Sequence, residues 1–137
     1  MANSKSIGVA FLDQDIIGAQ YLLADEQIGY TAAAQGTVTQ ATDKSTGVTL
    51  NKPAGRITMN NASLTTATNA TFTLTNSFIS ANDTVALTIS GGQATAGSYN
   101  VFANSLAAGS VSISLRNISG GTLSEAVVIN FAVIHCA

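Results

Sequence analysis

The chain has 137 residues, of which 46% are hydrophobic and 9% charged, with a formal net charge of −2. A chain of this length forms one domain with a core that needs no metal or disulfide, and its single cysteine, Cys136, excludes an intrachain disulfide. The five basic residues are scattered, which argues against a nucleic-acid partner, because nucleic acids require a basic patch or stripe. No apolar run approaches the roughly eighteen residues that cross a membrane.

The low charge content also bears on assembly. Typical domains carry about 25% charged residues, so this surface must depend on hydroxyl and amide groups for its solubility. A weakly charged surface near zero net charge repels its own copies little. We therefore expect the protein to associate with itself; the alternative is a monomer kept soluble by these hydroxyl and amide groups.

Residues 1–35 differ in composition from the rest. They carry four of the seven acidic residues, and glycines interrupt their short apolar stretches. Helices this short are marginal without packing partners. We interpret residues 1–35 as an N-terminal arm, with at most a helical turn or a strand, and residues 36–137 as the folded domain. The first apolar run ends at Asp13 and is too short for the core of a signal peptide, so we expect synthesis in the cytoplasm.

The stretch 36–61 predicts a strand, a polar loop, a second strand, a tight turn and a third strand. Apolar residues alternate with polar ones on both sides of the turn: Val48, Leu50, Ile57 and Met59. Period two places such side chains on one face of a sheet. Pro53 suits the turn, and Gly55 suits a following position with positive φ. We expect a hairpin here, around which the later strands pair.

The same alternation recurs to the end of the chain, with turn signals every 8–14 residues. The inward sets are Phe72 and Leu74; Val85, Leu87 and Ile89; Tyr99, Val101 and Ala103; and Val111, Ile113 and Leu115. Many short strands at this spacing are typical of a sandwich or barrel. The predicted fold class is all-β, an antiparallel β-sandwich of the jelly-roll or Greek-key kind, with an N-terminal arm.

The last strand, predicted at 124–135, is apolar on both faces. A strand exposed to water on one side would alternate, whereas one covered on both faces would not. The cover is either the rest of the same domain or another subunit. The candidate subunit interface is Val127, Ile129, Phe131 and Val133. Asn130 interrupts this run and must find hydrogen-bond partners if it is buried.

The residues that catalysis requires are scarce. The only histidine, His135, is adjacent to Cys136, and neighbours in a strand point to opposite faces, which is poor geometry for a base and a nucleophile. The glycine pairs lack the Lys-Ser/Thr of a phosphate loop, and one His with one Cys does not make a structural zinc site. We expect no enzyme activity, and no catalytic, cofactor-binding or metal-binding residues.

Three runs carry a family resemblance: TVTQATDKSTGVTLNKPAGRITMNNASL, ATFTLTNSFISANDTV and LSEAVVINFAVI. They resemble small virion proteins of tailed bacteriophages, most of all head decoration (cement) proteins. The resemblance implies a homotrimer on the outer head surface of the virion, with the phage major capsid protein as its partner and no cofactor. Similar β-rich pieces resemble parts of tail and fibre proteins, so the alternative is a tail-fibre or surface module that recognises host glycan.

The arm is the candidate anchor. Its apolar side chains have no companion pattern: Ile7, Val9, Phe11, Leu12, Ile16, Ile17, Tyr21 and Leu22. Either they complete the protein's own sandwich, as an edge strand or a plug between subunits, or they dock on the capsid shell. Docking would cost ordering entropy, which burial of these groups would offset.

Overall fold

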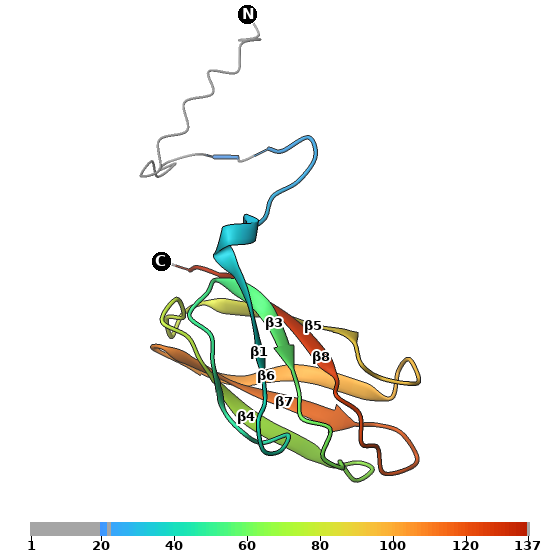
Figure 1. Cartoon of the computed structure of the whole chain (residues 1–137). Helices are drawn as coiled ribbons and strands as arrows, with labels where there is room; N and C mark the ends of the chain where they lie inside the picture. Colours follow the sequence, from blue (N-terminus) through green and yellow to red (C-terminus); the bar gives the residue numbers. More distant parts are fainter. Residues whose placement is uncertain (1–19, 22, 137) are drawn as a thin grey trace, which may run out of the picture.

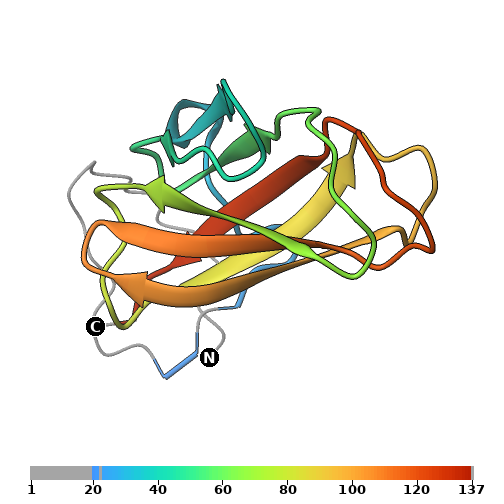
Figure 2. The same cartoon turned by 90° about the horizontal axis from the view of Figure 1, so that it is seen from below.

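Two four-stranded sheets pack face to face in the computed structural model, which describes residues 20, 21 and 23–136 (Figures 1 and 2). Within these residues there is no α-helix, only a short 3₁₀ turn. The elements are η1 (Ala32–Ala34), β1 (Gln35–Thr39), β2 (Val48–Thr49), β3 (Ala54–Thr58), β4 (Asn69–Thr75), β5 (Thr84–Gly91), β6 (Tyr99–Ala107), β7 (Ser110–Asn117) and β8 (Val128–Ile134). The predicted all-β sandwich is confirmed.

The sheets have the strand orders β1-β3-β8-β5 and β2-β4-β7-β6. Both are mixed, because the edge pairs β1–β3 and β2–β4 are parallel while the other pairs are antiparallel. The chain changes sheet at every connection except the one between β6 and β7. The expected hairpin at 36–61 is therefore wrong: β2 and β3 lie in different sheets, and β3 pairs with β1 and β8 instead.

The predicted alternation does describe the core. The inward side chains of β4 and β7 are fully buried, and those of β5 and β6 pack against the same cluster from the sandwich edge. Val48, Ile57 and Met59 join it, although they reach it from different sheets. The period-two pattern thus identifies the buried face of each strand that alternates, without identifying the strand's neighbours.

Gly55 does not adopt the positive φ expected of a turn residue; it lies within β3, where it pairs with Gly36 of β1. A Cβ atom on Gly55 would lie 2.7 Å from the Gly36 carbonyl oxygen and 2.7 Å from Leu50 Cδ2. A Cβ atom on Gly36 would also meet Leu50, at 2.8 Å. The two glycines are needed because Leu50 packs directly over their backbones.

The candidate interface residues of the last strand also require correction. Val127, Ile129, Phe131 and Val133 are at most 3% exposed and lie in the chain's own core, between the sheets. They are not available to a partner. β8 is a central strand, flanked by β3 and β5, and its outward set is Val128, Asn130, Ala132 and Ile134.

Asn130 points outward from β8 and is half-buried. Its Oδ1 accepts hydrogen bonds from Arg56 Nε at 3.3 Å and Ser90 Oγ at 3.0 Å, across the two neighbouring strands. The polar interruption in the apolar run thus finds partners on the sheet surface, and no amide enters the core at this position.

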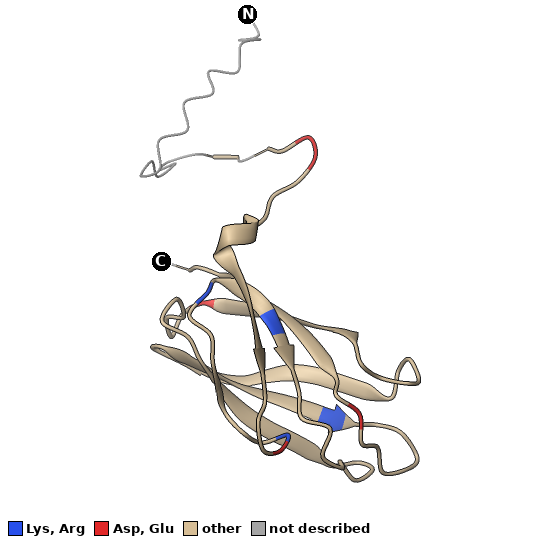
Figure 3. Ribbon diagram, viewed as in Figure 1, with Lys and Arg blue, Asp and Glu red and all other residues tan. Residues whose placement is uncertain are grey.

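The sandwich has two ends, which we name by the path of the chain. The arm end carries η1, the turn before β3, the loop 76–83 and the chain's exit after β8 (Figure 1). The far end carries the loops 40–47, 59–68, 92–98 and 118–127. Charged side chains are sparse in the sandwich. Four of them lie at the far end: Asp43, Lys44, Arg116 and Glu125 (Figure 3).

Candidate interaction surface

Large apolar side chains are exposed mainly at one end of the molecule. Of the seven that stand out among the described residues, six lie at the arm end or on the segment that leads to it. We define these six as the attachment surface: Tyr21, Leu23, Ile28, Tyr30, Phe78 and Ile134. The seventh, Ile118, follows β7 at the far end. Exposed apolar residues are ordinary when scattered, whereas a cluster indicates a contact site.

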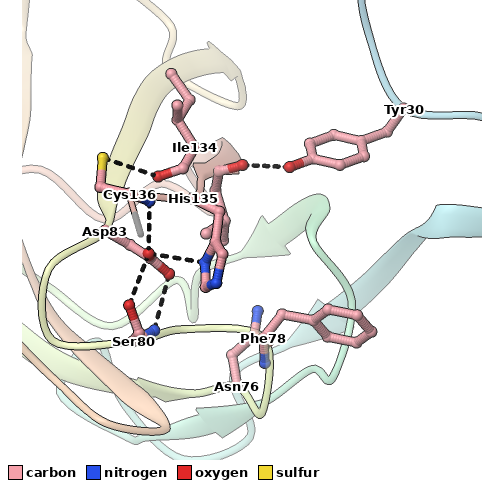
Figure 4. Close-up of polar contacts among 9 residues, drawn as sticks. Tyr30, Asn76, Phe78, Ser80, Asp83, Ile134, His135 and Cys136 are labelled. Atoms are coloured by element: carbon pink, nitrogen blue, oxygen red, sulfur yellow. Dashed lines mark hydrogen bonds and ion pairs between the residues drawn. The ribbon is translucent and has the colours of Figure 1, made fainter. Parts of the chain in front are cut away.

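Tyr30 ties the segment before β1 to the sandwich. Its hydroxyl donates a hydrogen bond to the Val133 carbonyl oxygen at the end of β8 (Figure 4). Gln35 Nε2 donates to the Tyr30 carbonyl oxygen at 3.1 Å and fixes the backbone on the other side. Residues 20–29, by contrast, are exposed wherever the structure describes them. The folded part of the chain therefore begins near Tyr30, a few residues before the predicted boundary at 36.

A buried asparagine positions Phe78. Asn76 is fully buried after β4, where its Nδ2 donates to the Lys52 carbonyl oxygen at 2.7 Å and its Oδ1 accepts from the Phe78 amide at 2.9 Å. This Asx turn reverses the chain, so that Ile79 enters the core and the Phe78 ring stays half exposed. Figure 4 shows the Phe78 and Tyr30 rings lying to the same side of the C-terminal residues.

A shallow hollow of about 280 Å³ separates the two rings. Its lining is Tyr30, Pro53, Phe78, Val133 and His135. Apart from His135 and the Tyr30 hydroxyl, which is already bonded, these groups are apolar. Such a hollow accepts an apolar side chain from a partner more readily than a polar small molecule, which requires several convergent polar groups.

Asp83 fastens the chain's C-terminal residues to the same end. Its carboxylate accepts from the Ser80 amide at 2.8 Å, the Ser80 hydroxyl at 2.7 Å and the Cys136 amide at 3.1 Å, and His135 Nδ1 lies 2.8 Å from it (Figure 4). The backbone hydrogen bond from Ser80 is the main reason that the pKa of Asp83 lies well below its ordinary value; burial opposes the shift, and the other donors reinforce it.

This cluster of serine, aspartate and histidine does not have the geometry of a catalytic triad. Ser80 Oγ donates to Asp83, whereas a nucleophile would donate to the histidine. Asp83 stands in the centre and receives every bond. The arrangement holds the loop 76–83 and the chain end together and thereby supports the attachment surface.

A second hollow crosses the outer face of the sheet β1-β3-β8. We name it the alanine trough: its volume is about 490 Å³, and its floor contains Ala54 and Ala132, which are register partners on β3 and β8. One bank is the next row of outward side chains, with Arg56 and Asn130, and the other is the segment with Gly29 and Tyr30. The trough exists because single methyl groups lie between two rows of larger side chains.

No protein-family model matches the chain, and no curated protein matches it. Among residues 20, 21 and 23–136, no helix is long and apolar enough to cross a membrane. In the same part of the chain, no three side chains of the His, Cys, Asp and Glu types gather as they would around a metal ion.

The structure describes only one of the candidate docking residues on the arm. Tyr21 is exposed, while Ile7, Val9, Phe11, Leu12, Ile16, Ile17 and Leu22 lie outside the described residues. Sequence reasoning missed Tyr30, Phe78 and Ile134. The sequence did carry a signal near Phe78: Asn76 takes the place of an apolar residue in the alternation of Phe72 and Leu74, two positions before Phe78, and asparagine is a residue type that starts Asx turns.

Proposed function

We propose that this protein is a structural component of a bacteriophage virion, which decorates the outer capsid surface and stabilises it. The observation that supports the proposal is the concentration of exposed apolar side chains at the arm end. A molecule that binds only the assembled shell stabilises that shell by its binding free energy. Such a role needs a durable fold and a contact surface, and it needs no active site.

The proposed partner is the phage major capsid protein, in line with the resemblance of three sequence runs to head decoration proteins. The attachment surface would bury Phe78 and Ile134 of the sandwich together with Leu23 and Ile28 of the segment that leads to it. Leu23 is 87% exposed and Phe78 is 50% exposed, so both gain from being covered. Several copies on a symmetric shell would add avidity to the affinity of each contact.

The test is binding to purified heads that lack the protein, with Phe78→Ser as the variant. Half of the Phe78 surface is exposed, and covering that half contributes about 1.5 kcal/mol, so its loss should weaken binding about tenfold per subunit. Ile118→Ser at the far end is the matched control, because Ile118 is 52% exposed. It should bind as the unchanged protein does.

Two results would overturn the proposal. Absence of binding by the unchanged protein to such heads would remove the capsid as partner. Equal weakening by Phe78→Ser and Ile118→Ser would show that the arm end has no special part in attachment. Circular dichroism of each variant would confirm that the sandwich is intact, since both side chains lie outside the core.

The alternative, recognition of host glycan, has less support at this surface. Sugar binding requires aromatic faces beside convergent hydrogen-bonding groups. The hollow has two aromatic rings, Tyr30 and Phe78, but His135 is its only other polar side chain. We therefore do not propose a glycan site at the arm end.

A further inference from the structure

We propose that the alanine trough is the binding site for residues 7–11 of a second copy of this chain. This goes beyond the proposed function, because it concerns contacts between copies and holds whatever the assembly attaches to. It also gives the expected self-association a defined site, in place of the residues of β8 that are buried in the core. Three observations carry it: the shape of the trough, its charge, and the direction in which the N-terminal segment leaves the sandwich.

The floor of the trough matches the segment in size and character. Ala54 and Ala132 line the trough, and Ala86 of β5 continues their register row beyond it, so the row of methyl groups is two inter-strand spacings long, about 10 Å. In residues 7–11, apolar side chains alternate with Gly8 and Ala10. An extended chain from Ile7 to Phe11 spans about 13 Å and places Ile7, Val9 and Phe11 on one side. One apolar edge of the segment thus covers a row of methyl groups.

The trough carries one charge, and no carboxylate among the described residues compensates it. Arg56 lies in the row next to the alanines, and its printed hydrogen bond is to the amide oxygen of Asn130 at 3.3 Å. Guanidinium groups pair best with carboxylates, in a bidentate geometry. Asp13 and Asp15 follow Phe11 by two and four residues. A segment whose apolar part lies on the alanines brings these acidic residues toward the Arg56 row.

The path of the chain favours a second copy over the same one. Gly29 and Tyr30 form one bank of the trough, so the N-terminal segment starts at its edge. The described residues between 20 and 28 are exposed and lead away from the sandwich, not across the sheet (Figure 1). Ten extended residues reach at most about 35 Å, which is enough to arrive at a neighbour. Each copy then gives one segment and receives one, and such a head-to-tail contact forms a ring where the rotation between copies closes and an open filament where it does not.

Disulfide trapping in the full-length chain tests the site and the donor together. In a Cys136→Ser background, one protein carries Val9→Cys and another carries Ala132→Cys, and the two are mixed so that subunits exchange. If residue 9 lies over the floor of the trough, the two Cβ atoms come within the roughly 4 Å that a disulfide requires. Mild oxidation should then link the two proteins about tenfold faster than it links Val9→Cys to Ser105→Cys. Ser105 is exposed on β6, in the other sheet.

The outcomes separate the possibilities. Preferential linkage of positions 9 and 132 between chains supports the proposal. Linkage no faster than to position 105 overturns it. A chain that carries both cysteines and closes on itself, without forming linked pairs, shows that the trough binds its own segment and overturns the part played by the second copy. None of these measurements involves a capsid, so they are independent of the proposed attachment.

Discussion

The two ends of the sandwich share one structural feature, a buried asparagine that binds a loop, but they expose different kinds of side chain. Each end has a fully buried asparagine after a strand, Asn76 after β4 and Asn117 at the end of β7, and each asparagine binds the backbone of the loop that follows. The residues beyond them differ. The arm end leaves apolar side chains uncovered, whereas the far end collects charged and amide groups and satisfies most of them internally.

The far end is closed by buried polar side chains. Lys44 is 3% exposed, and its Nζ donates to the carbonyl oxygens of Asn60 and Glu125, each at 2.5 Å. Gln40, also buried, donates to the Lys44 and Thr46 carbonyl oxygens. Burial lowers the pKa of Lys44, and the nearby Glu125 opposes that shift only in part. These groups are engaged with the chain's own backbone and are not offered to a partner.

Tyr99 and Glu125 extend this closed region. Burial, and next the neighbouring Glu125, raise the pKa of Tyr99 to about 12. Glu125 Oε1 accepts from the Ala94 amide at 2.7 Å, while its Oε2 and the Tyr99 hydroxyl are buried without a hydrogen bond of normal geometry. The far end thus uses its buried charged groups to hold its own loops, whereas the arm end, although Asp83 fastens the C-terminal residues there, leaves large apolar side chains exposed.

The largest expected effect comes from Asn117→Ala at the far end. Its side chain donates to the carbonyl oxygens of Leu64 and Gly121, both at 2.8 Å, and accepts from the Ser119 amide and hydroxyl. Leaving several of these groups unpaired should lower the free energy of unfolding by about 3 kcal/mol. Urea denaturation measures this. The folded variant should bind heads as the unchanged protein does. If it binds more weakly under conditions in which it is fully folded, the far end also takes part in attachment.

Asn76→Ala at the arm end should lower the free energy of unfolding less than Asn117→Ala does, but it should weaken head binding more. Asn76 makes two such bonds, to Lys52 and Phe78, so about 2 kcal/mol should be lost. Because the Asx turn sets the direction of Phe78, binding to heads should weaken as well. The two asparagine variants, measured side by side by urea denaturation and by head binding, should therefore rank in opposite orders. The same order in both measurements would mean that stability alone decides attachment.

Asp83→Asn should change the acid dependence of stability. The folded pKa of Asp83 is lower than the ordinary value of 3.8, so its stabilising contribution is complete above that value and is lost as the pH falls below it toward the folded pKa. The unchanged protein should lose stability as the pH falls below about 4, and the variant should lose less over the same range. Asp43→Asn in the exposed far-end loop is the control. An unaltered slope in Asp83→Asn would show that the carboxylate does not fasten the chain end.

The sequence predicted the core well because burial of a strand face has a local period. The alternation of apolar and polar residues predicts that Val111, Ile113 and Leu115 are buried, and all three are fully buried. Strand partners carry no such period: nothing near Val48 or Ile57 indicates that they belong to opposite sheets. In β8 both faces are apolar, so the pattern contains no sign of which set is inward. The predicted interface therefore coincides with the inward set, whereas the set that faces outward includes Ala132.

The attachment surface was harder to predict for a related reason. Phe78 and Tyr30 are single aromatic residues in loops, and their exposure depends on contacts distant in sequence, such as that of Tyr30 with Val133. The sequence predicts a contact surface in the arm, and Tyr21 is the one residue of that prediction that the structure describes. The sequence does not show that the loop 76–83 and the residues after β8 meet beside the segment that precedes β1. Asp83 and Cys136 come together only because β5 and β8 pair in the folded sheet.

The smallest expected effect is that of His135→Ala, which tests which contacts to Asp83 hold the C-terminal residues at the arm end. The His135 side chain is 69% exposed and contributes one of the contacts to Asp83, whose bonds from Ser80 and from the Cys136 amide would remain. Because the His135 side chain is largely exposed, its contact with Asp83 contributes little to stability, so thermal unfolding should shift by only about 1–2 °C. Because His135 also lines the hollow beside Phe78, its removal widens an apolar site without unfolding it, and head binding should remain within about threefold of the unchanged protein. A destabilisation as large as that of Asn76→Ala would mean that the histidine, and not the backbone donors of Ser80 and Cys136, holds the chain end in place.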